Sequence, residues 1–76
     1  VNLKQRMAEV LRRVRAHFGP LPFSLLVIRG EERLPRLEVL VTFLAVLELM
    51  RQAEISAWQA GPLGEILLTL PDCRPE

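Results

Sequence analysis

The side chains that could do chemistry by themselves are few and widely spaced in this chain of 76 residues. His17 has no second metal ligand at a suitable spacing, and Ser24 has no His or Asp arranged with it as a triad would require. Cys73 is the single cysteine, and a nucleophilic thiol needs a base beside it. Glu31 and Glu32 adjoin each other in a polar stretch typical of a solvated turn. The sequence therefore predicts no catalytic residue, no metal site and no cofactor.

Basic residues offer a second kind of chemistry, the binding of phosphates. Residues 1–18 hold five basic residues and one acid, whereas the rest of the chain has more acids than bases, and the whole carries a net charge of +1. Such a local excess of cations can attract a polyanion, although a solvated helix face is the simpler interpretation. The candidates for non-specific DNA contact are Arg6, Arg12, Arg13 and Arg15.

Length and composition limit how these residues can be positioned. A chain of this size makes one domain, and its 50% hydrophobic residues are enough for a core without disulfides. No signal peptide and no apolar run of about 18 residues is present, so we expect a cytoplasmic protein without a membrane span. The chain begins at Val1 rather than Met, which suggests a segment of a longer protein. We expect a single domain over residues 1–76, with residues 71–76 as a flexible tail.

The first predicted element is an amphipathic helix over residues 3–18. Asn2 can cap its first turn, and Gly19-Pro20 ends it, because glycine accepts the conformation past a helix and proline cannot continue one. Its apolar residues recur at steps of three and four, which predicts one buried stripe. The stripe comprises Leu3, Met7, Val10, Leu11, Val14 and Phe18.

A second and longer helix is predicted over residues 35–52, with Pro35 in its first turn. Most of its apolar residues fill an arc of about 180°, which we expect to be the core side. This inner arc contains Leu37, Val39, Leu40, Phe43, Leu44, Val46, Leu47 and Met50. Val41, Ala45 and Leu49 then form an apolar strip on the expected outer side.

The remaining segments favour an α+β fold, a small winged-helix domain of three helices with a C-terminal β-hairpin wing. Residues 23–28 can form either a short helix, capped by Ser24, or a buried strand, since six residues do not separate the two by periodicity. Residues 54–59 and 65–70 alternate as strands and are joined by a Gly-Pro turn. In the second strand we expect Ile66, Leu68 and Leu70 to share the core face.

Winged helices often read DNA with the second helix of the helix-turn-helix, whose exposed face then carries base-reading groups. The face expected to be exposed here presents Glu38 and Glu48, which would repel phosphates. Protein binding fits better, because Trp58 projects from a strand and Leu63 lies at the turn tip. Trp58 has an equally good alternative, packing against the first helix. A DNA-binding regulator, and a homodimer formed through the Val41–Leu49 strip, remain as alternative functions.

Two short motifs resemble the C-terminal domain of the kleisin family, in its bacterial segregation and condensation branch. These are Phe43-Leu44-Ala45-Val46-Leu47-Glu48-Leu49 in the long helix, and Gln59 followed by Gly64-Glu65-Ile66 in the hairpin. The resemblance covers residues 37–70 well and residues 1–36 in outline. Leu63 stands where the family usually has an aromatic residue, which is a departure from the family pattern.

The resemblance implies a non-catalytic, nucleoid-associated docking module. Kleisins bridge the two heads of an SMC (structural maintenance of chromosomes) ATPase dimer, and the C-terminal winged helix docks on the cap side of one head. Other parts of a kleisin bind the neck of the second head and the accessory protein B (ScpB) dimer. Candidate contacts with the SMC head are Val41, Leu49, Trp58, Leu63 and Leu67. Motif residues expected to be structural are Phe43, Leu44, Leu47, Gln59, Gly64 and Ile66, with Gln59 satisfying backbone groups of the wing and Gly64 permitting its turn.

Overall fold

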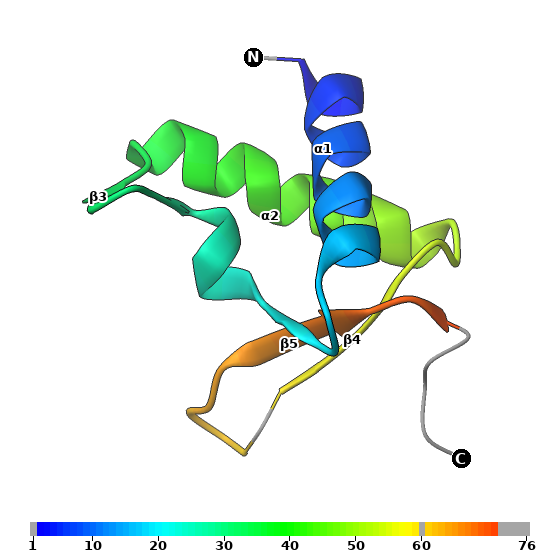
Figure 1. Cartoon of the computed structure of the whole chain (residues 1–76). Coiled ribbons are helices and arrows are strands. Elements are labelled where there is room, and N and C mark those ends of the chain that lie inside the picture. Colours follow the sequence, from blue (N-terminus) through cyan, green and yellow to red (C-terminus); the bar gives the residue numbers. More distant parts are fainter. Residues whose placement is uncertain (1, 60, 72–76) are drawn as a thin grey trace.

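The computed structural model describes residues 2–59 and 61–71, and the fold is α+β as predicted (Figure 1). Two α-helices cross, and a small antiparallel sheet lies below their crossing point in the view of Figure 1. The helices are α1 (Leu3–Ala16) and α2 (Arg36–Arg51), with a single 3-10 turn, η1 (Phe23–Leu26), between them. Of the tail predicted at residues 71–76, residues 72–76, with Cys73, lie outside the described residues.

The strands form two small sheets. In the larger sheet β5 (Ile66–Thr69) lies between β1 (Leu21–Pro22) and β4 (Ser56–Gln59), and β4 and β5 form the predicted hairpin. The smaller sheet pairs β2 (Ile28–Arg29) with β3 (Glu32–Arg33). The ambiguous residues 23–28 thus contain both a helical turn and the start of a strand. Ser24 is not its cap: the Ser24 N–H donates to the Glu65 carboxylate at 3.0 Å, which ties η1 to the hairpin.

Helix α1 begins where the sequence predicts. The Asn2 side-chain oxygen accepts hydrogen bonds from the N–H groups of Lys4 at 2.8 Å and Gln5 at 3.3 Å, so two otherwise unpaired donors are satisfied. Val10 and Val14 are buried as expected. Phe18 is not part of the stripe, because the helix ends at Ala16 and the Phe18 side chain is fully exposed.

The core face of α2 is the opposite of the one predicted. Ala45 is 0% exposed and Leu49 is 3% exposed, although both were expected on the outer side. Thr42 is also buried, and its hydroxyl is satisfied by donating to the Glu38 backbone oxygen at 2.8 Å. Of the eight residues of the predicted inner arc, Val46 alone is fully buried, and the others are exposed or half-buried.

The reason for this reversal is packing between the two helices. Apolar residues surround nearly all of α2, so its periodicity gives only a weak preference for one face. The strongly amphipathic α1 packs across it, and side chains at the contact set how closely two helices approach. Ala45 lies in one core cluster with the β-branched Val10 and Val14, and Thr42 on the same side of α2 is buried as well, whereas leucines at positions 42 and 45 would hold the helices apart.

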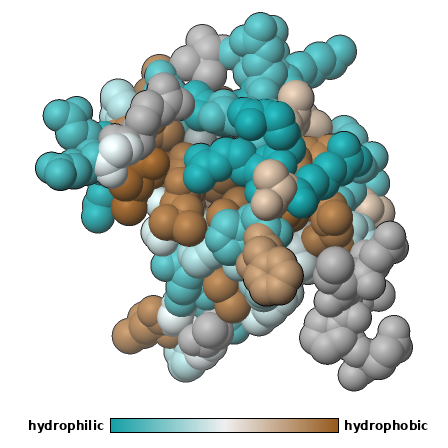
Figure 2. Space-filling view, in the orientation of Figure 1, coloured by the Kyte–Doolittle hydropathy of each residue, from teal (hydrophilic) through white to brown (hydrophobic). Residues whose placement is uncertain are grey.

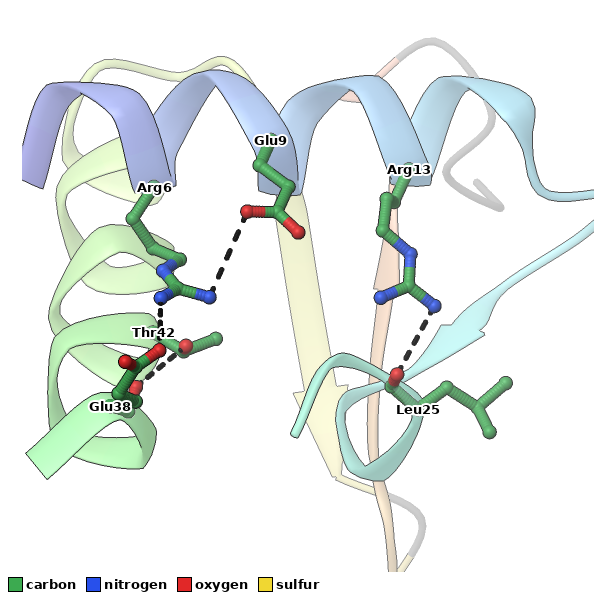
Figure 3. Close-up of polar contacts among 6 residues, drawn as sticks. All are labelled: Arg6, Glu9, Arg13, Leu25, Glu38 and Thr42. Carbon is green, nitrogen blue, oxygen red and sulfur yellow. Dashed lines mark hydrogen bonds and ion pairs between the residues drawn. The ribbon is translucent and has the colours of Figure 1, made fainter. Parts of the chain in front are cut away.

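An ion pair sets the same orientation. Arg6 of α1 is 9% exposed, and its guanidinium donates to the Glu38 carboxylate of α2 at 2.6 Å (Figure 3). A second carboxylate, that of Glu9, lies 3.7 Å from the same guanidinium. The pair forms only when the Glu38 side of α2 faces α1, which again leaves the leucine-rich side outward.

We expect Arg6→Ala to lower the free energy of unfolding by about 1–2 kcal/mol. Breaking a fully buried pair typically costs about 3–5 kcal/mol and losing a surface pair about 0–1 kcal/mol, and Glu38 is 32% exposed. Urea denaturation followed by circular dichroism measures the change. Arg12→Ala removes an exposed arginine from the same helix and should change stability by less than about 0.5 kcal/mol. Equal losses in both variants would show that the Arg6–Glu38 pair does not stabilise the fold.

Candidate protein-docking surface

The outward side of α2 carries several large, exposed apolar side chains. Leu37 is 65% exposed and Leu47 is 45% exposed, and four further large side chains are exposed to a comparable degree. We define this surface as the α2 face, made up of Leu37, Leu40, Phe43, Leu44, Leu47 and Met50. Single exposed apolar residues are common on soluble proteins. Six of them on one helix of so small a domain form an apolar patch of the kind that marks a protein-interaction site.

A groove continues the α2 face onto the hairpin. It lies between α2 and β4, and we call it the α2–β4 groove; its lining is Phe43, Val46, Leu47, Met50, Ala57, Trp58, Gln59 and Ile66. The Phe43 ring makes an edge-to-face contact with the Phe23 ring, with ring centroids 6.0 Å apart. Most of the side chains that line the groove are apolar, and they include the Trp58 indole ring and the Met50 thioether. Such side chains are enriched where proteins bind each other.

Trp58 lies between the docking surface and the first helix. Its side chain is 38% exposed and lines the α2–β4 groove, and it also lines a second groove together with Val14 and His17 at the end of α1. Trp58 faces Leu67 across the β4–β5 pair, and residues so paired lie side by side on one face of a sheet. These two of the predicted contacts are thus neighbours.

The other predicted contacts lie apart. Leu49 is wrong as a surface residue, because it belongs to the core, and Val41 on the neighbouring side of α2 is half-buried. A homodimer through a Val41–Leu49 strip is excluded with it, since Leu49 and Ala45 do not reach the surface. Leu63 is almost fully exposed at the hairpin tip, away from α2.

The motif residues divide into two groups. In the hairpin, the Gln59 amide donates to the Pro62 and Gly64 backbone oxygens at 3.2 and 3.1 Å, as expected, and Ile66 packs against the core. The positive φ that the hairpin turn requires is at Gly61, at 91°, and Gly64 is not among the described glycines with such a backbone.

In α2 the prediction of a buried structural role is wrong. Phe43, Leu44 and Leu47 are exposed and form the middle of the α2 face. The signal that could have identified this face is the pair of small residues Thr42 and Ala45, which mark where a second helix approaches closely.

The basic residues of α1 also divide. Arg6 is buried in its ion pair, and Arg13 donates to the Leu25 backbone oxygen at 3.1 Å, so both point inward from α1 (Figure 3). Arg6 is therefore wrong as a DNA contact, because its guanidinium is unavailable. Arg12 and Arg15 remain exposed.

The described part of the chain contains neither a metal-binding cluster nor a membrane-spanning helix. Within 2–59 and 61–71, no group of three His, Cys, Asp or Glu residues is placed to hold a metal ion. In the same part of the chain, neither helix is long and apolar enough to cross a membrane.

Comparison with known proteins places the chain in a family. No family model matches the chain. The segregation and condensation protein A of Myxococcus xanthus (strain DK1622) is 41% identical over 68 residues, which are 90% of this chain. Over this matched segment, the chain belongs to the segregation and condensation protein A family. It spans 23% of the length of that relative.

A solved structure agrees in fold. The C-winged helix domain of the segregation and condensation protein A, ScpA, has been crystallised bound to the SmcHead, and its structure superposes with a TM-score of 0.71. The match covers 91% of this chain and 99% of that one, at 23% identity. The winged-helix fold expected from the sequence is thereby confirmed.

Proposed function

We propose that this segment of the segregation and condensation protein A family is a non-catalytic module that docks on the cap side of an SMC ATPase head. In the full-length protein this docking would help to close the SMC–kleisin ring used in chromosome segregation and condensation. The C-winged helix domain of ScpA in the solved relative is bound to an SmcHead, which supports the choice of partner. Binding of the ScpB dimer is assigned to other parts of the full-length protein, which we propose acts in the cytoplasm at the nucleoid.

The observation that carries the proposal is the apolar α2 face and its continuation into the α2–β4 groove. Burying apolar surface is the main source of affinity in stable protein complexes, and a few central aromatic and aliphatic residues usually supply most of it. Leu47 and Met50 belong to the α2 face and also line the α2–β4 groove together with Trp58, so we place the centre of the contact there.

The same surface argues against reading of DNA by α2. An exposed recognition helix needs side chains that hydrogen-bond to base edges, whereas the α2 face is made of six apolar residues and the arginines of α2, Arg36 and Arg51, lie at its two ends. The two carboxylates of α2 are both engaged by arginines, Glu38 by Arg6 and Glu48 by Arg51. Hydrogen bonds from Arg51 and Gln52 lower the pKa of Glu48 to about 2, so it stays ionised at neutral pH.

Co-elution with the cognate SMC head on a size-exclusion column tests the proposal. We expect a one-to-one complex with a dissociation constant of about 1 µM or tighter, which corresponds to about −8 kcal/mol. Light scattering of this chain alone at high concentration should give the mass of a monomer. A stable dimer would instead assign the α2 face to a second copy of the chain, and absence of co-elution would contradict the proposal.

A further inference from the structure

A second surface, on α1, is independent of the docking surface. At about 100° per residue, three basic side chains of α1 fall within an arc of about 100°. We define the α1 basic face by this arc, which contains Lys4, Ala8, Leu11, Arg12 and Arg15. The side of α1 that packs on α2 is different, as it carries Arg6, Val10 and Val14. Figure 2 shows hydrophilic side chains along α1 on the side of the molecule that faces the viewer.

The three cations are available for an external partner. Lys4, Arg12 and Arg15 are exposed, in contrast to Arg6 and Arg13, whose guanidinium groups bind within the domain. Helix α1 contains one acid, Glu9, and its carboxylate lies toward the Arg6 guanidinium. The positive charge of the α1 basic face is therefore not neutralised from within its own helix.

The shape of this face suits a backbone of phosphates. A shallow depression runs along it, lined by Ala8, Leu11, Arg12, Arg15 and Ala16. From Lys4 to Arg15 the helix rises by about 16 Å, over which one strand of a DNA duplex carries about five phosphates. Small residues at the floor let the phosphates come close while the arginines flank them.

We propose that the α1 basic face binds the phosphate backbone of double-stranded DNA without sequence preference. A protein partner would require large apolar side chains at the centre of the contact, and the apolar lining of the depression on this face is two alanines and one half-buried leucine. It has no side-chain acceptor between its cations, so it contacts phosphates and leaves the base edges unread. Because α1 and α2 expose different sides, the domain can hold DNA and an SMC head together.

The experiment is a titration of this chain into a short fluorescent duplex of arbitrary sequence, followed by anisotropy at several salt concentrations. Three phosphate contacts predict that the logarithm of the association constant falls with the logarithm of salt concentration with a slope of about −2.7. A fourfold rise in salt should then weaken binding about 40-fold. No SMC head is present, so failure here leaves the docking proposal intact, and failure of docking leaves this one intact.

The variant Lys4→Gln/Arg12→Gln/Arg15→Gln should lose at least tenfold in affinity at low salt, with a slope close to zero. Its matched control, Arg33→Gln/Arg36→Gln/Arg51→Gln, removes the same charge from exposed arginines elsewhere and should stay within about twofold of wild type. An equal loss in the control would overturn the assignment to α1, as would absence of binding by the wild-type chain at low salt. Competition by polyglutamate as strong as by unlabelled duplex would assign the face to acidic polypeptides and overturn the proposal.

Discussion

Leu49→Ala is expected to lower the free energy of unfolding by about 2–5 kcal/mol, enough to unfold much of the population. Leu49 is 3% exposed and belongs to the core cluster with Val10 and Val14, so the shorter side chain leaves a cavity. Cavities of this kind typically cost about 2–5 kcal/mol, and a domain of this size has only about 3–5 kcal/mol from its core. Urea denaturation, or the melting temperature by circular dichroism, measures the loss.

Leu44→Ala is the matched control, the same substitution on the opposite side of the same helix. Leu44 is 53% exposed, so we expect a change of less than about 1 kcal/mol. The pair of variants tests the orientation of α2 directly, since the sequence periodicity predicts the reverse order of effects. A larger loss for Leu44→Ala than for Leu49→Ala would mean that α2 is turned the other way.

Leu47→Glu is expected to weaken binding to the SMC head at least 30-fold while leaving the domain folded. Leu47 lies on the α2 face and at the edge of the groove beside Trp58, so a carboxylate there would be buried in an apolar contact on docking. Loss of such a central residue typically costs about 2 kcal/mol or more, which corresponds to about 30-fold or more in affinity. Isothermal titration calorimetry against the cognate head measures the change.

Leu3→Glu controls for the added charge and the lost leucine. Leu3 is 41% exposed, close to the 45% of Leu47, but it lies at the start of α1, where a carboxylate also interacts favourably with the helix dipole. Its affinity for the head should stay within about threefold of wild type. Circular dichroism of both variants must give the wild-type helix content for the comparison to hold. Unchanged binding by a folded Leu47→Glu variant would remove the α2 face from the contact.

The local elements could be predicted because their signals are local. Asn2 caps α1 through its own side chain, and Gly61-Pro62 joins two alternating strands. Gln59 is within reach of the turn that it stabilises, so its role too could be inferred from a few neighbouring residues. The order of these elements predicts the winged-helix fold, and the spacing of the two motifs predicts the family.

The docking surface could not be predicted in the same way. Burial of Leu49 depends on where α1 crosses α2. That crossing depends on the small residues Thr42 and Ala45 and on the Arg6–Glu38 pair, whose two residues are 32 positions apart in the sequence. Periodicity counts apolar residues without regard to their size, so it assigned the leucine-rich arc to the core. Helix packing instead placed the side with Thr42, Ala45 and Leu49 inward and left most of the leucine-rich arc exposed.

The sequence by itself therefore determined the two long helices, the cap that starts the first of them, the β4–β5 hairpin, and that the chain has an apolar surplus for a partner. Only the tertiary structure decided which side of α2 presents that surplus, and which arginines of α1 stay available for phosphates. The physical reason is the same in both cases. Where a helix carries apolar residues or arginines on several sides, each of them is buried or exposed according to what packs against it, and that partner is distant in the sequence.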